Sequence, residues 1–181
     1  PSTLTLTPAS RHRVIDVGAG DPDAVAAAAE ALAAAERPFL FAGKGVLWAE
    51  ASEEFVALGD HLAAAMSTTL GARGVVPEDH PHYFPIADAN TLRAVRTDAD
   101  VVLVVGARLG EYDGWGLPPA WGDPATQHTI QIDCDPASLG LNRPVDQMIL
   151  ADARRSLSRL VTEVRARCEP RSELAGAETY A

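Results

Sequence analysis

Two glycine-containing segments carry residue types that suit the binding of a phosphate. Gly43-Lys44-Gly45 follows the apolar run 39–42, and Gly106-Ala107-Arg108 follows the apolar run 101–105. A glycine turn lets the backbone approach a phosphate closely, while lysine and arginine supply cations. Each segment also has an ordinary interpretation. The first is more simply a plain strand-to-helix turn, and the arginine of the second is equally a salt-bridge partner of a neighbouring loop.

Asp133 and Asp135 flank Cys134 at the end of the run 129–133. An aspartate at the end of a strand can bind the hydroxyl groups of a ribose. Asp135-Pro136 is also typical of the start of a helix, so both interpretations stay open.

Other catalytic and metal-binding patterns are incomplete. Gly43-Lys44-Gly45 lacks the Lys-Ser/Thr pair of a P-loop and the third glycine of the dinucleotide fingerprint. Asp79-His80-Pro81-His82 has the spacing of a metal pair but no obvious third ligand.

The elements that would position these segments alternate between strands and helices. Strands are predicted near 39–42, 66–70, 101–105, 129–133 and 145–150, and helices near 22–36, 52–65, 91–95 and 154–165. The run 101–105 is apolar throughout, which is typical of a strand that is covered on both faces. The alternation predicts an α/β fold, a three-layer doubly wound domain with a mostly parallel sheet. In such a sheet, ligands bind at the carboxyl ends of the strands.

Composition narrows the classes of partner. The 181 residues include 15 Lys+Arg and 25 Asp+Glu, and the net charge of −10 disfavours nucleic acid as a partner. No apolar run reaches the length of a membrane helix, and no secretory signal is recognisable. With two cysteines, Cys134 and Cys168, a cytoplasmic protein is expected. We expect a linker or arm at 1–20, one domain at 21–167 and a second linker or tail at 168–181.

Several short motifs occur in a specific order along the chain. They are Arg37-Pro38, Gly43-Lys44-Gly45-Val46, Thr68-Thr69, Gly71, residues 74–81, 99–109 and 130–135, Asn142, Val145-Asp146 and Asp152. Together they resemble the central domain of thiamine-diphosphate-dependent enzymes of the acetolactate synthase superfamily. The Gly-Lys-Gly and Gly-Ala-Arg-Leu segments are most similar to the oxalyl-CoA decarboxylase-like branch.

The resemblance implies a parallel sheet of about six strands in an excised, non-catalytic central domain. The parent enzyme would be a homo-oligomer that uses thiamine diphosphate and Mg²⁺. It would cleave or form a carbon–carbon bond next to the carbonyl of a 2-oxo acid or acyl-CoA. Its pyrimidine-binding and diphosphate-binding domains would be the partners of this chain. Their activating glutamate and Gly-Asp-Gly…Asn motif are not found in this sequence, so the isolated chain is expected to be inactive.

The resemblance also implies a nucleotide site. Its residues would be Gly43, Lys44, Gly45, Gly106, Ala107, Arg108, Asp133 and Asp152, and its ligand ADP or FAD. Residues 82–87 depart from the glycine-rich stretch of flavin-binding relatives, which disfavours FAD. Two alternatives remain: a ligand-free scaffold domain of the same enzyme, and an independent NAD-using enzyme with a sirtuin-like sheet.

Overall fold

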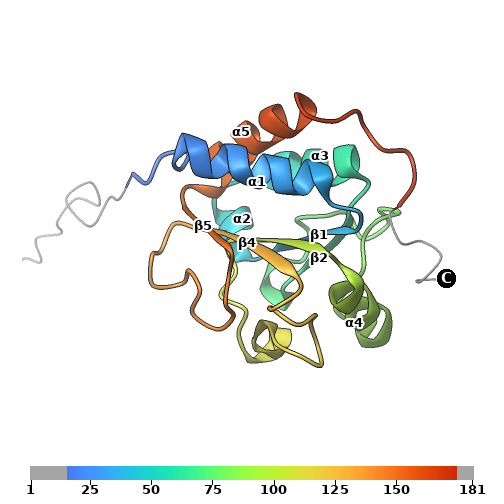
Figure 1. Cartoon of the computed structure of the whole chain (residues 1–181). Coiled ribbons are helices and arrows are strands. Elements are labelled where there is room, and N and C mark those ends of the chain that lie inside the picture. The colour runs from blue at the N-terminus through green and yellow to red at the C-terminus, as the bar shows by residue number, and fades with distance from the viewer. Residues whose placement is uncertain (1–15, 175–181) are drawn as a thin grey trace, which may run out of the picture.

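The structure is a computed structural model that describes residues 16–174. A parallel sheet lies between two layers of helices, which confirms the α/β, three-layer architecture (Figure 1). The elements are α1 (Pro22–Ala34), β1 (Pro38–Ala42), α2 (Lys44–Trp48), α3 (Ser52–Leu62), β2 (Ala65–Thr68), η2 (Leu70–Ala72), α4 (Ala89–Asp98), β3 (Val101–Val105), η3 (Glu111–Gly116), β4 (His128–Asp133), β5 (Gln147–Leu150) and α5 (Ala153–Arg165).

The sheet has five strands in the order β2-β1-β3-β4-β5, and every neighbouring pair is parallel. β3 is the central strand, and all five of its residues are buried. This confirms the expectation that the continuous apolar run 101–105 is covered on both faces.

The expected sixth strand is reduced to one bridging residue beside β2. Met66 N donates to His82 O at 2.8 Å, and Phe84 N donates to Met66 O at 2.8 Å, so that Tyr83 pairs with Met66. Pro81 and Pro85 flank this contact. Because proline has no N–H to donate, the ladder does not continue on either side. The expectation of about six strands is therefore one too many for the described residues.

The two faces of the sheet carry separate apolar cores. The α1-side core contains Leu40 and Leu103 together with side chains of α1, α3 and α5. The α4-side core contains Phe39, Phe41 and Trp121 together with side chains of α4. Figure 1 shows α1, α3 and α5 on one side of the sheet and α4 on the other. The alternation of residues 39–41 between the cores follows from the two-residue period of a strand.

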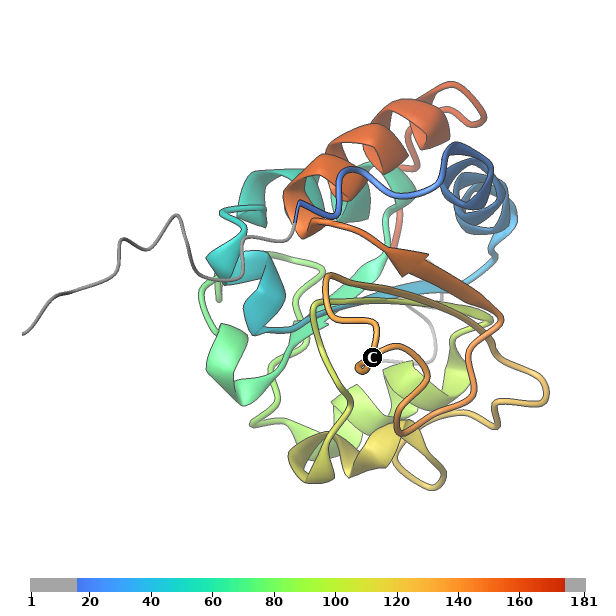
Figure 2. The ribbon, with the colours of Figure 1, turned by 90° about the vertical axis from the view of Figure 1, so that its left-hand side faces the viewer.

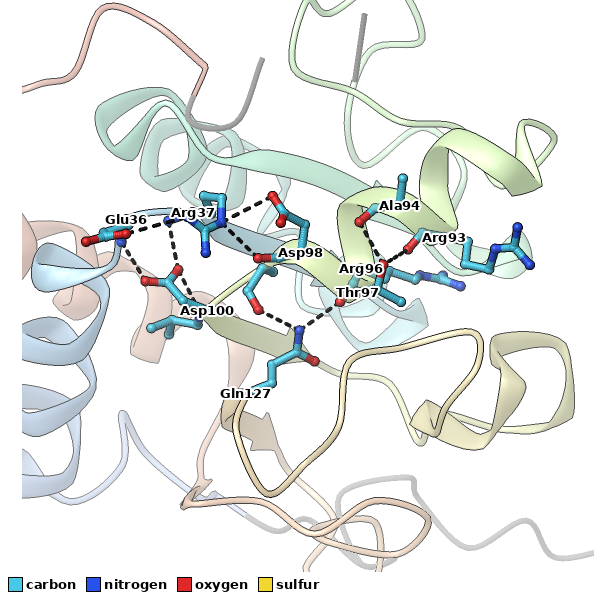
Figure 3. A network of polar contacts seen from close by, with 11 residues as sticks. Glu36, Arg37, Arg93, Ala94, Arg96, Thr97, Asp98, Asp100 and Gln127 are labelled. Carbon is cyan, nitrogen blue, oxygen red and sulfur yellow. Dashed lines mark hydrogen bonds and ion pairs between the residues drawn. The ribbon is translucent and has the colours of Figure 1, made fainter. Parts of the chain in front are cut away.

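A network of polar contacts joins the connections at the amino ends of β1 and β3 (Figure 3). The Asp100 carboxylate accepts from Glu36 N at 2.6 Å and from Arg37 N at 2.7 Å. Gln127 Nε2 donates to the carbonyl oxygens of Arg96 and Ala99, both at 2.7 Å. These contacts fix the entry of two adjacent strands.

The first and the last few described residues contact the rest of the domain. Gly18 O accepts from Asp152 N at 2.9 Å, and Arg171 N donates to His61 O at 2.9 Å. Residues 1–15 and 175–181, which make up most of the expected linkers, lie outside the described residues. Between residues 16 and 174, no helix combines the length and the apolar character needed to cross a membrane.

Candidate functional site

The carboxyl ends of β1 and β3 lie side by side where the strand order reverses. β1 pairs with β2 on one side and with β3 on the other, so the chain crosses over between these two neighbours. Such a reversal is where open α/β sheets bind ligands. The structure therefore brings the Gly43–Gly45 and Gly106–Arg108 segments together at this edge. Figure 2 views the molecule from this side.

The two glycine turns pack directly against each other. Gly43 N donates to Val105 O at 2.8 Å, and Gly45 N donates to Gly106 O at 3.1 Å. A Cβ atom on Gly45 would lie 2.6 Å from Gly106 Cα, which is too close for any side chain. Because their amides are already used, Gly43 and Gly45 are not free to donate to a phosphate in this structure. The glycines are explained first by this close approach.

The cations of the two segments remain exposed and lie on either side of the glycine contact. The Lys44 side chain leans over η2, where its Cδ lies 3.3 Å from the position of a Cβ on Gly71. Arg108 is exposed on the side of β4, and its carbonyl oxygen accepts from Asn142 Nδ2 at 2.8 Å. Ala107, by contrast, is buried in the α4-side core and presents no side chain to the edge.

Asp133 is a buried carboxyl group at the end of β4. Its Oδ1 accepts from Asp135 N at 2.9 Å, and 9% of the residue is exposed. Burial raises the pKa of Asp133, while the Asp135 amide and the charge of Arg108 act in the opposite direction. A carboxyl in this position can hydrogen-bond a hydroxyl group. The chain that follows forms a turn, not a helix, with Asp135 Oδ1 accepting from Ala137 N at 3.0 Å.

Asp152 serves α5. Its side chain accepts from Arg155 N at 2.9 Å and so caps the first turn of that helix. Its own amide donates to Gly18 O. These contacts account for an aspartate at this position without a ligand.

Sequence reasoning missed Arg96, which is buried on the opposite side of the sheet from α5. Its guanidinium carbon lies 4.8 Å from the ring centre of Phe41 and 4.4 Å from that of Trp121. Burial lowers the pKa of Arg96 to about 10. The available signal was its spacing, because Arg96 follows the buried Leu92 by four residues and so lies on the apolar stripe of α4.

Metal ligands do not gather at the edge or elsewhere in the described part of the chain. Across residues 16–174, no group of three or more His, Cys, Asp or Glu side chains is arranged to hold a metal ion. His80 Nε2 instead contacts Asp60 Oδ1 at 2.9 Å, and His80 Nδ1 accepts from His82 N at 3.2 Å. The edge provides two cations for an anion, Lys44 and Arg108, and one carboxyl group for a hydroxyl group, Asp133.

Residues 25–160 match the family model described as "Thiamine pyrophosphate enzyme, central domain". The chain is 32% identical over 145 residues to the "Probable acetolactate synthase large subunit" of Methanocaldococcus jannaschii, which covers 78% of this chain and 24% of the relative. It is 36% identical over 141 residues to a sulfoacetaldehyde acetyltransferase of Rhodobacter capsulatus, covering 75% and 23%. It is 33% identical over 136 residues to 2-hydroxyacyl-CoA lyase 1 of Mus musculus, covering 75% and 22%.

A solved structure, described as that of "a putative thiamin diphosphate-dependent enzyme isolated from Mycobacterium smegmatis", has the same fold. The TM-score is 0.68 at 28% identity, and the match covers 94% of this chain and 33% of that one. The chain thus spans about a quarter of the curated relatives it matches and a third of the solved structure.

Proposed function

The chain belongs to the family of thiamine pyrophosphate enzyme central domains, and on that premise we propose that it is a non-catalytic, adenine-nucleotide-binding domain of a longer enzyme. The nucleotide diphosphate would lie near Lys44 and Arg108, and its ribose near Asp133. The observation that carries this proposal is the placement of the exposed Arg108 and the buried Asp133 at the carboxyl ends of the adjacent strands β3 and β4.

Side chains, more than backbone amides, would hold the nucleotide. The amides of Gly43 and Gly45 donate to Val105 and Gly106, so the glycines let the turns come together and leave Lys44 and Arg108 to contact phosphate. An arginine can bind a phosphate through two parallel hydrogen bonds, and this geometry suits a diphosphate. Asp152 would contribute only through a carboxylate oxygen that is not used to cap α5.

The full enzyme would carry out the chemistry outside this chain. Thiamine diphosphate would supply the electron sink for making or breaking a carbon–carbon bond beside a carbonyl. The relatives named above include a synthase, an acetyltransferase and a lyase at 32–36% identity. We therefore propose a 2-oxo acid or an acyl-CoA as the class of substrate. No metal cluster occurs in residues 16–174, so Mg²⁺ would be held by another domain.

We further propose the setting in which this domain works. Pyrimidine-binding and diphosphate-binding domains would adjoin it in the same polypeptide, and the enzyme would be a cytoplasmic homo-oligomer. The relatives' greater length supports the presence of other domains. The NAD-using alternative gains no support from these comparisons, since the matched family is defined by thiamine pyrophosphate enzymes.

A ligand-free scaffold is the second candidate, and the engaged amides favour it. If Gly43 and Gly45 serve only to pack the turns, the edge needs no nucleotide to be complete. In that case, the domain would only hold its neighbours in place.

Titration of the isolated chain with ADP separates the two candidates. Arg108→Ala should lose a charge-assisted contact of about 1.5–3 kcal/mol, or roughly ten- to a hundredfold in affinity. Arg159→Ala on α5 is the matched control and should leave the affinity unchanged. Equal losses in both variants, or tighter binding of FAD than of ADP, would contradict the proposed site. Absence of ADP binding by the wild type would favour the scaffold.

A further inference from the structure

One face of β4 carries buried polar side chains at every second position. Thr129, Gln131 and Asp133 are all buried. Ile130 and Ile132, which alternate with them, belong to the α1-side core, so the three polar side chains point to the α4 side of the sheet. β4 lies between β3 and β5, and a strand inside a parallel sheet is usually apolar on both faces. Each polar side chain in this row therefore calls for a partner that accounts for it.

Gln131 joins the chain segments that follow β3 and β4. Its Nε2 donates to Ala107 O at 3.0 Å and to Ser138 O at 3.1 Å. Its Oε1 accepts from Gly140 N at 2.8 Å. Ala107 belongs to the glycine-containing turn after β3, whereas Ser138 and Gly140 belong to the loop after β4. Both hydrogens of the side-chain amide and its oxygen are thus bonded to the backbone of these two segments.

A second side chain ties the same two segments together nearer the surface. Asn142 Nδ2 donates to Arg108 O at 2.8 Å, so the loop after β4 also holds the backbone of the arginine. At the start of this loop, Asp135 N donates to Asp133 Oδ1 at 2.9 Å and orients the carboxyl group. Burial raises the pKa of Asp133, and the charge of Arg108 opposes that rise. The arginine and the carboxyl group therefore act on each other electrostatically.

These contacts bear on how one ligand could reach both groups. A nucleoside diphosphate that contacts Arg108 through its phosphates and Asp133 through its ribose needs the two side chains at a fixed separation. Asp133 is part of β4 and is placed by the sheet, but Arg108 lies on an exposed turn beyond the end of β3. Gln131 and Asn142 supply side-chain contacts that fix this turn to the loop after β4.

We propose that Gln131 is a positioning residue of the nucleotide site, which holds the turn of Arg108 at the separation from Asp133 that a nucleoside diphosphate requires. The inference rests on the proposed function, in which an adenine nucleotide contacts these two side chains. Gln131 is 2% exposed and would not contact the ligand itself. Without its hydrogen bonds, the turn of Arg108 would gain freedom that the ligand would have to remove on binding.

Calorimetric titration with ADP tests this role. Gln131→Leu keeps a similar volume but leaves three backbone groups without their partner, and it should weaken ADP binding about tenfold. Gln127→Leu is the matched control. Gln127 is also a buried glutamine whose Nε2 donates to two carbonyl oxygens, but these belong to Arg96 and Ala99, before the amino end of β3 (Figure 3).

The two glutamine variants should differ in affinity and not in stability. Both should lower the melting temperature, because each leaves buried backbone groups unpaired. Gln127→Leu should change the affinity for ADP by less than about twofold. Equal losses of affinity in the two variants would show that the loss follows from lower stability, and would overturn the positioning role.

A double-mutant cycle tests whether Gln131 acts through Arg108. In the Arg108→Ala background, Gln131→Leu should weaken ADP binding by less than about twofold, because no guanidinium remains to be positioned. If the losses of the two single variants instead multiply in the double variant, Gln131 acts on the site independently of Arg108, and the inference is wrong.

Asn142→Ala gives a test that does not disturb a buried position. It removes the bond to Arg108 O, and it should weaken ADP binding about threefold without lowering the melting temperature by more than a few degrees. A wild-type chain that binds ADP, together with Gln131→Leu and Asn142→Ala variants that bind it equally well, would overturn the positioning role alone. A wild-type chain that does not bind ADP would contradict the proposed function, and the role of Gln131 with it.

Discussion

At the scale of single residues, the contact between Gly45 and Gly106 determines how the edge of the sheet is built. Gly106 has a φ of +60°, and its backbone touches that of Gly45. Both positions therefore exclude a side chain, but for Gly106 there are two reasons, the backbone conformation and the steric contact. The two reasons can be separated experimentally.

Gly106→Ala should lower the free energy of unfolding by about 2 kcal/mol or more, measured by urea denaturation. The left-handed conformation alone costs an L-residue about 1–2 kcal/mol, and the clash with Gly45 adds to it. Gly18→Ala is the control, because Gly18 has a φ of +63° and a Cβ atom there would meet no heavy atom within 4 Å. Equal losses in the two variants would show that the contact between the turns does not limit position 106.

The buried carboxyl of Asp133 should make stability depend on pH. Burial raises its pKa in the folded chain, so the folded state binds more protons than the unfolded state between the two pKa values. Its contribution to stability is present at low pH and is lost as the pH rises from near 4 through the folded pKa. The stability of Asp133→Asn relative to the wild type should therefore increase between pH 4 and pH 7. The exposed Asp79→Asn is the control, and a constant difference for Asp133→Asn would contradict the prediction.

At the scale of elements, the position of a strand in the sheet determines how it tolerates charge. Leu103 is fully buried at the middle of β3, whereas Leu150 on the edge strand β5 is 41% exposed. Leu103→Asp should cost several kcal/mol, because it buries an unpaired carboxylate. Leu150→Asp should cost less than about 1 kcal/mol. Thermal melting and soluble yield of both variants check this, and a normally melting Leu103→Asp would contradict the central placement of β3.

The elements that could be predicted from sequence are those with a continuous local signal. The run 101–105 matches β3 residue for residue, and 39–42 and 129–133 each fall one residue short of the observed strand. The expectation of a sixth strand came from the family resemblance and not from a local pattern. In the structure, Pro81 and Pro85 limit the pairing beside β2 to Tyr83. Proline spacing is thus the local signal that should have outweighed the resemblance.

At the scale of the whole molecule, topology predicted which segments meet but not how their polar groups are used. Parallel strands end at one edge, so the two glycine turns were expected together, and they are. That the amides of Gly43 and Gly45 donate across to the other turn depends on the packing of two distant segments. The stacking of the Arg96 guanidinium on Phe41 and Trp121 likewise depends on how segments distant in the sequence pack together. Local patterns contain neither piece of information.

The proposed division of the enzyme into domains predicts that this chain alone does not bind thiamine diphosphate. In the proposed function, the diphosphate would be held through Mg²⁺, an ion that prefers oxygen ligands such as carboxylates in octahedral geometry. The sequence has no Gly-Asp-Gly…Asn motif, and residues 16–174 contain no cluster suited to a metal. Calorimetry of the isolated chain with thiamine diphosphate and Mg²⁺ should give no saturable heat, and incubation with a 2-oxo acid should release no CO₂. The full-length enzyme is the positive control in both assays. Tight, saturable binding by the isolated chain would mean that the cofactor site lies within this domain, and that its neighbours are not needed to build it.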